Sequence, residues 1–159
     1  MSQISPQFAP PASPVLSIET LTLALPALAD RAHAVENITL AIAPGETLCV
    51  VGESGSGKSM IAHAVMGLLP KAVKPVGGAI RLAGRDLLGL DEAAMQDVRG
   101  REVGMIFQEP MTSLNPVMRV ADQIVETFEA HGLFGRSERY RRAVDLLAEV
   151  GLPDPPRLA

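Results

Sequence analysis

The chain has few aromatic residues, one cysteine and little excess charge. There is no Trp, one Tyr and four Phe in 159 residues, and the formal net charge is −4. Such a chain offers neither the basic face nor the aromatic stacking platform typical of nucleic-acid binding, so no nucleic-acid partner is expected. The lone Cys49 excludes a disulfide framework and suits a reducing cytoplasm. Within its apolar run, Cys49 is expected to be a small buried residue.

Membrane, metal and nucleophile signals are also missing. No apolar run approaches the ~18 residues of a membrane span. No Lys or Arg precedes Arg31, so neither a secretory nor a twin-arginine signal is expected, and any membrane association must come through a partner. The three histidines are far apart in the sequence, without nearby Cys or paired carboxylates, which gives a zinc or iron site little support.

The strongest feature present is a glycine-rich motif that matches the phosphate-loop pattern G-x-x-x-x-G-K-[ST]. Its residues are Gly52, Glu53, Ser54, Gly55, Ser56, Gly57, Lys58 and Ser59. Glycines let the backbone wrap an anion with its N–H groups pointing inward. Lys58 is the candidate ligand of the β- and γ-phosphates, and the Ser59 hydroxyl is the candidate Mg²⁺ ligand. The motif therefore predicts a nucleotide site.

The sequence around the motif has the required order. Residues 47–51 form a short apolar, β-branched run that predicts a buried strand. Residues 60–69 predict a helix that is stopped by Pro70. The helix would add its positive N-terminal dipole to the phosphate site.

The rest of the chain is predicted to form a tail, several strands and three further helices. Residues 1–14 carry four prolines and predict a disordered tail. Strands are predicted at 15–25, 36–42 and 76–84, and a short helix is predicted from its cap Asp91 to about Arg99. A further apolar run at 103–107 ends in Gln108, where a strand would give way to a loop. Two amphipathic helices are predicted. One is residues 120–131, with Val120, Ile124 and Phe128 on one face, and the other is residues 137–150, with Tyr140, Val144, Leu147 and Val150 aligned.

The region around Gln108 carries a family resemblance. Gln108 stands about 50 positions after Lys58, and residues 107–116 read Phe-Gln-Glu-Pro-Met-Thr-Ser-Leu-Asn-Pro. This decapeptide resembles the Q-loop of the ATPase subunits of ATP-binding cassette (ABC) transporters, in the oligopeptide, dipeptide and nickel importer subfamily. Residues 67–70 and the last helix with its Pro-rich end are also similar to that subfamily. The resemblance covers nearly everything from Val15 onward.

The resemblance implies a fold and a set of roles. The fold class would be α/β, a P-loop nucleotide-binding domain with an N-terminal β subdomain, the start of the RecA-like core and a helical subdomain. Residues 15–159 would form the N-terminal portion of that domain. ATP would bind at residues 52–60, which add Met60 to the motif. Lys58 and Gln108 would be the catalytic residues, with Ser59 and Gln108 touching Mg²⁺.

The partners implied by the resemblance are membrane-embedded permease subunits, contacted through the Q-loop region, and a second ATPase subunit. The protein would then be peripheral on the cytoplasmic face of the inner membrane and would energise import of peptides or related small solutes. The transported solute would be selected by other subunits.

The sequence departs from the family in two places. The family usually stacks adenine on an aromatic residue upstream of the phosphate loop, whereas this chain has only His33 as a substitute there. An LSGGQ signature and a Walker B strand ending in Asp-Glu are also absent from the 159 residues. The resemblance thus covers a truncated subunit, which alone should hydrolyse ATP negligibly. Apolar side chains left without their cover should face solvent, namely those of Leu48, Val50, Ile106 and Phe107.

Two other interpretations remain open from the sequence. One is a non-catalytic nucleotide-binding or interaction fragment that occupies ATP or permease without turnover. The other is an unrelated phosphate-loop kinase or GTPase, which the decapeptide and the lack of an Asn/Thr-Lys-x-Asp guanine-reading motif disfavour.

Overall fold

The computed structural model describes residues 13–108 and 114–158. The chain divides into two compact units, residues 1–95 and 96–159, with the division inside helix α2. The predicted disordered tail, residues 1–14, lies almost wholly outside the described residues.

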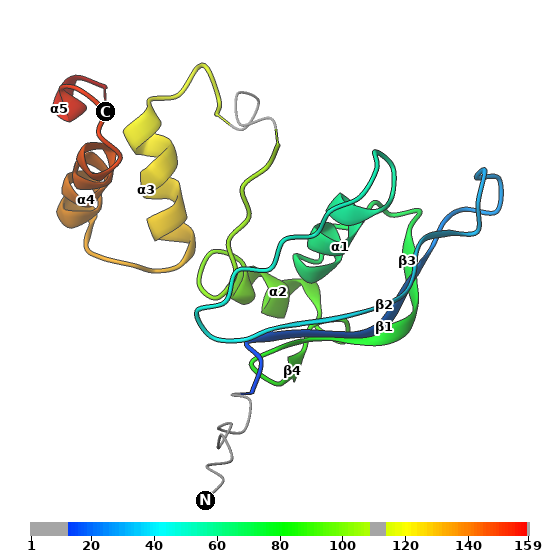
Figure 1. The fold of residues 1–159 in the computed structure, drawn as a ribbon. Helices are drawn as coiled ribbons and strands as arrows, with labels where there is room; N and C mark the ends of the chain where they lie inside the picture. Colours follow the sequence, from blue (N-terminus) through cyan, green and yellow to red (C-terminus); the bar gives the residue numbers. More distant parts are fainter. Residues whose placement is uncertain (1–12, 109–113, 159) are drawn as a thin grey trace, which may run out of the picture. The chain divides into compact units, whose positions relative to one another are not determined.

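The first unit is built on an antiparallel sheet, visible in Figure 1 as the blue, cyan and green strands. Its strands are β1 (Leu16–Ala24), β2 (His33–Ile42), β3 (Lys74–Leu82) and β4 (Arg85–Asp86), in the order β2-β1-β3-β4. The three strands predicted at 15–25, 36–42 and 76–84 are confirmed, although β2 begins at His33 rather than Glu36. The very short β4 had no sequence prediction, because two residues are too few to show a period.

One face of this sheet carries the core of the first unit. Ile18, Leu21 and Leu23 of β1 and Ile80 of β3 are fully buried. Leu21 and Leu23 are two positions apart and therefore share a face, as the pleat of a strand requires. Ile18 stands three positions before Leu21, and the register shift between these two residues lets its side chain be buried as well. Burial of each large aliphatic side chain contributes roughly 1.5–3 kcal/mol to stability. The central strand β1 therefore anchors the sheet.

Helix α1 (Lys58–Val65) follows the phosphate loop and ends earlier than predicted. The stop was expected at Pro70, but Gly67 takes a left-handed φ of 63°. The Gly67 N–H donates to the Ala64 carbonyl and the Leu68 N–H to the His63 carbonyl, at 3.1 and 2.8 Å. This pair of bonds is the Schellman arrangement that closes a helix on a glycine. The helix is therefore closed at Gly67, three residues before the proline that was expected to end it.

Helix α2 (Glu92–Val98) agrees with its predicted cap. The Asp91 carboxylate accepts a hydrogen bond from the Ala94 backbone N–H at 2.8 Å, which satisfies one of the free donors of the first turn. Met95 and Val98 are buried on one side of this short helix.

Two predicted strands are wrong. Residues 47–51 and 104–107 have no regular secondary structure, and Val103 makes only an isolated parallel bridge with Arg99. An apolar run shows that a segment favours burial, but a strand also requires a hydrogen-bonded neighbour. Within the described residues, no strand pairs with either run.

The same two runs are exposed. Cys49, expected to be buried in the first run, is exposed as well. Exposure of the four apolar side chains singled out from the sequence is confirmed. Leu48, Val50 and Phe107 are each more than a third exposed, and Ile106 is 95% exposed.

The second unit contains an α-helical hairpin. Helices α3 (Val120–Ala130) and α4 (Arg136–Glu149) lie side by side in Figure 1, and the short helix α5 (Pro155–Leu158) follows. Ala121, Ala143 and Leu147 form the buried centre of the pair. The predicted face of α3 packs on this centre through Val120, Ile124 and Phe128, as does Val144 of α4.

Two of the residues predicted to align on one face of α4 are exposed rather than packed on the hairpin core. Tyr140 is 42% exposed and Val150 is 73% exposed. Val150 is the C-terminal cap residue of α4, at the end of the hairpin's second helix. The α5 turn within the Pro-rich end was not predicted from the sequence.

Candidate nucleotide-binding site

The phosphate loop lies in the first unit, between residues 47–51, which have no regular secondary structure, and helix α1. The predicted order of loop and helix is confirmed, while the strand expected before them is not formed. Gly57 is the N-terminal cap residue of α1 and makes no side-chain cap bond. The N–H groups of a first helical turn lack intrahelical acceptors, and the helix dipole is positive there. The start of α1 is therefore suited to an anion.

Gly57 sits where strand β2 presses against the loop. Its φ is 92°, in the left-handed region that glycine tolerates without a steric penalty. A Cβ placed on Gly57 would lie 2.5 Å from the Ala34 carbonyl oxygen and 2.8 Å from Cγ1 of Val35. Ala34 and Val35 are both buried in β2. A glycine is thus required here for two reasons, its backbone conformation and its close approach to the sheet.

The Lys58 side chain folds back over the loop. Its Nζ donates to the carbonyl oxygens of Gly52 and Glu53 at 2.7 and 2.6 Å, and to the Ser56 hydroxyl at 3.3 Å. These contacts use loop oxygens, which would otherwise repel an anion. They also hold a positive charge over the loop, as a phosphate site requires. Lys58 is thereby brought together with three of the residues predicted for the site.

The remaining predicted loop residues follow the same arrangement. Ser59 and Met60 occupy the first turn of α1, with Ser59 exposed and Met60 partly buried. The Ser56 N–H donates to the Glu53 carbonyl at 3.2 Å, which closes a turn around Ser54 and Gly55. All nine residues predicted to hold the nucleotide, Gly52 to Met60, thus belong to one continuous loop and helix start.

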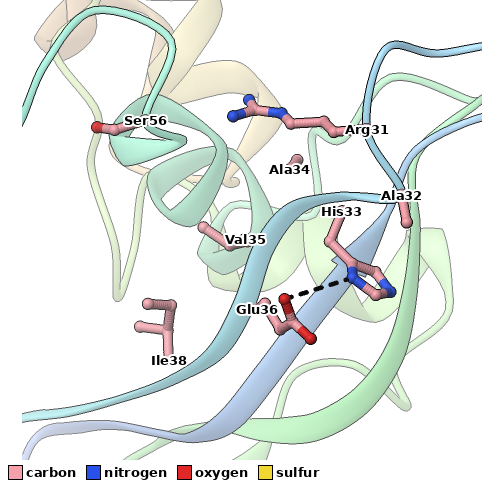
Figure 2. Close-up of a pocket in the computed structure, with 8 residues that line it drawn as sticks. All are labelled: Arg31, Ala32, His33, Ala34, Val35, Glu36, Ile38 and Ser56. Atoms are coloured by element: carbon pink, nitrogen blue, oxygen red, sulfur yellow. Dashed lines mark ion pairs between the residues drawn. The ribbon is translucent and has the colours of Figure 1, made fainter.

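Arg31, which sequence reasoning did not single out, contacts this loop. Its guanidinium donates to the Gly55 carbonyl oxygen at 2.7 Å, across 24 positions of sequence. Arg31 lies in the connection between β1 and β2, and Figure 2 shows its side chain extended toward the side on which Ser56 lies. No sequence motif links the two segments. Only the folding of the β1–β2 hairpin brings them together.

A cavity of about 370 Å³ opens beside the loop. It is lined by Ser56 and by residues of the β1–β2 connection and β2, namely Arg31, Ala32, His33, Ala34, Val35, Glu36 and Ile38. Figure 2 shows the His33 imidazole turned to the Glu36 carboxylate, with 3.7 Å between Nδ1 and Oε2. His33, the expected substitute for an adenine-stacking aromatic residue, therefore lines a cavity that adjoins the phosphate loop.

Gln108 belongs to the second unit and is exposed. Residues 109–113 of the decapeptide lie outside the described residues. The contact of Gln108 with Mg²⁺ therefore stays a prediction. Within residues 13–108 and 114–158, no helix is both long and apolar enough to cross a membrane.

Comparisons with known proteins find relatives that match most of the chain. The chain is 45% identical over 146 residues to an oligopeptide transport ATP-binding protein, OppD, of Mycobacterium tuberculosis, covering 91% of this chain and 24% of the relative. It is 43% identical over 145 residues to OppD of Bacillus subtilis, covering 89% of this chain and 40% of the relative. The chain thus spans less than half the length of these curated relatives.

The fold is also found among solved structures. The ATP-binding cassette MJ0796, a bacterial ABC transporter cassette solved as a dimer, aligns with a TM-score of 0.72 at 23% sequence identity. The alignment covers 87% of this chain and 58% of that one. The profile of the ABC transporter family matches residues 35–158, which include the phosphate loop and the helical hairpin. The chain therefore belongs to the ABC transporter family.

Proposed function

We propose that this chain binds Mg-ATP at residues 52–60 and serves in the ATP-hydrolysing subunit of an ABC importer for peptides or related small solutes. The observation that carries the proposal is the Lys58 ammonium held over the phosphate loop by the Gly52 and Glu53 carbonyls. Family membership favours this function over an unrelated phosphate-loop kinase or GTPase. The peptide class is supported by the two relatives named as oligopeptide transport ATP-binding proteins.

The residues of the loop fit both parts of Mg-ATP. The N-terminal turn of α1 and the Lys58 ammonium suit phosphate oxygens, since charge-assisted hydrogen bonds are the stronger ones. The Ser59 hydroxyl supplies an oxygen ligand of the kind that Mg²⁺ prefers, and Gln108 is the second ligand that we propose. Bound Mg²⁺ would neutralise charge that develops on the phosphates during phosphoryl transfer. In that scheme Lys58 and Gln108 are the catalytic residues of this chain.

The proposed partners follow from the family. Permease subunits would be contacted through the region of residues 107–116, which resembles the Q-loop. A second ATPase subunit is supported by the dimeric structure of MJ0796. The protein would be peripheral on the cytoplasmic face of the inner membrane. The permease and its binding protein would select the transported solute.

The test of this function is Lys58→Ala. The variant should bind Mg-ATP about ten- to hundredfold more weakly, because charge-assisted hydrogen bonds contribute roughly 1.5–3 kcal/mol each. Affinity is measured by titration calorimetry with the 159-residue chain. Lys74→Ala is the matched control, since it removes an exposed lysine of β3 from the same unit. Equal affinities for wild type and Lys58→Ala would refute the proposed site.

The import role is tested by measuring peptide uptake in cells of the source organism that carry Lys58→Ala. Uptake of a radiolabelled oligopeptide should fall in the Lys58→Ala strain, while uptake of a free amino acid should not change. Peptide uptake that is unaffected in a strain with a proven loss of ATP binding would exclude the peptide importer.

A further inference from the structure

We propose that Arg31 is a positioning residue for the nucleotide site, which it serves by holding the Gly55 carbonyl of the phosphate loop. This inference rests on the proposed function of the loop. It adds a residue from outside the motif, from the connection between β1 and β2. The geometry that carries it is the 2.7 Å hydrogen bond from the guanidinium to the Gly55 oxygen.

The Arg31 contact complements those of Lys58. Lys58 holds the carbonyls at the start of the loop, Gly52 and Glu53, whereas Arg31 holds the Gly55 carbonyl near its middle. The peptide that follows Gly55 is then satisfied at both ends, because the Ser56 N–H donates to the Glu53 carbonyl. A loop oxygen that accepts a hydrogen bond from a cation has a positive charge beside it, which offsets its repulsion of an incoming anion.

Arg31 holds the loop at Gly55, where no other described atom lies close enough to restrict the backbone. A Cβ on Gly55 would have no atom within 4 Å, in contrast to the tight packing at Gly57. The Gly55 φ of 78° also lies in the left-handed region. Without the guanidinium, this segment would have more conformations to lose when phosphate binds, and ordering costs reduce affinity.

The inference predicts an effect that does not depend on the base. Arg31→Ala should weaken binding of Mg-ATP about two- to tenfold, since a charge-assisted but exposed hydrogen bond is lost. The same fold loss should appear with Mg-GTP, because Arg31 acts through the backbone that meets the phosphates. Arg31→Lys should restore most of the affinity, since an ammonium can still donate to the Gly55 carbonyl.

The experiment is titration calorimetry of the 159-residue chain with Mg-ATP and with Mg-GTP. Arg81→Ala is the matched control, because it removes a guanidinium that pairs with Glu19 on the sheet. Thermal unfolding without nucleotide should give the same midpoint for Arg31→Ala and Arg81→Ala, which separates positioning from general destabilisation.

The outcomes distinguish this inference from the function on which it rests. If Lys58→Ala weakens binding but Arg31→Ala matches Arg81→Ala, Arg31 has no positioning role and the proposed function survives. If the loss differs between Mg-ATP and Mg-GTP, Arg31 contacts the base directly and the inference is wrong. If Lys58→Ala leaves affinity unchanged, both proposals fail. Equal losses with the two nucleotides, rescued by Arg31→Lys, support it.

Discussion

Among substitutions in the phosphate loop, the structure predicts the largest loss of folding stability for Gly57→Ala. The new methyl group would lie 2.5 Å from the Ala34 carbonyl oxygen and 2.8 Å from Cγ1 of Val35. Both neighbours belong to the buried part of β2, so neither can move away cheaply. The methyl group must therefore displace the loop, the start of α1 or the strand.

The expected change in the free energy of unfolding of Gly57→Ala has three contributions. A left-handed conformation costs a residue other than glycine about 1–2 kcal/mol. Forcing an additional carbon into a packed region costs about 1–3 kcal/mol. Against these, alanine restricts the unfolded chain and returns about 0.4–1 kcal/mol. The free energy of unfolding should then fall by about 1–5 kcal/mol, with the steric part as the largest single contribution.

Two glycine controls isolate the steric part. Gly45 and Gly55 have φ values of 74° and 78°, close to that of Gly57. A Cβ at either position would meet nothing within 4 Å. Gly45→Ala and Gly55→Ala therefore include the conformational and unfolded-state contributions but not the clash.

The assay is urea unfolding of the three variants and the wild type, followed by circular dichroism. Gly57→Ala should be less stable than either control by about 1–3 kcal/mol, and should also bind Mg-ATP more weakly than Gly45→Ala. If Gly57→Ala and Gly45→Ala are equally stable, β2 does not press on the loop and the close approach described above is wrong.

Two further predictions concern the α2 cap and turnover. Asp91→Ala should lower the free energy of unfolding by about 1 kcal/mol, because it removes the 2.8 Å hydrogen bond from the Ala94 N–H. The control Asp97→Ala should change it little. Equal urea midpoints for the two variants would contradict the cap. The 159-residue chain assayed alone should release phosphate from Mg-ATP far below ~1 s⁻¹, a rate at the low end for enzymes, because it has no Walker B carboxylates. Lys58-dependent turnover near that rate would show that another residue replaces them.

Much of the first unit was accessible from the sequence because its signals are local. Alternating apolar residues predicted β1 and β2 within a few positions, the run that leaves a glycine turn predicted β3, and Asp91 marked the start of α2. The phosphate-loop motif predicted the start of α1 through the chemistry of one short segment. Such features depend on neighbours within a few residues, and the folded structure preserves them.

The errors concern interactions that are distant in sequence. The apolar run at 47–51 has the composition of a strand, yet strand formation depends on a partner that composition does not identify. The run at 103–107 fails for the same reason. Helix α1 ends before Pro70 because the backbone at Gly67 and Leu68 hydrogen-bonds to the carbonyls of the last helical turn.

The contacts of the candidate site depend both on a local sequence motif and on residues that are distant in sequence. The motif identifies Gly57 and Lys58, but only the fold shows that Ala34 and Val35 lie against Gly57 and that Arg31 reaches Gly55. These three residues lie within five positions of one another, at the β1–β2 connection and the start of β2. A short segment outside the motif thus meets the phosphate loop at two points, one steric and one polar. The loop conformation should therefore depend on the β1–β2 hairpin, and substitutions in residues 31–35 should alter nucleotide affinity although none of them belongs to the motif.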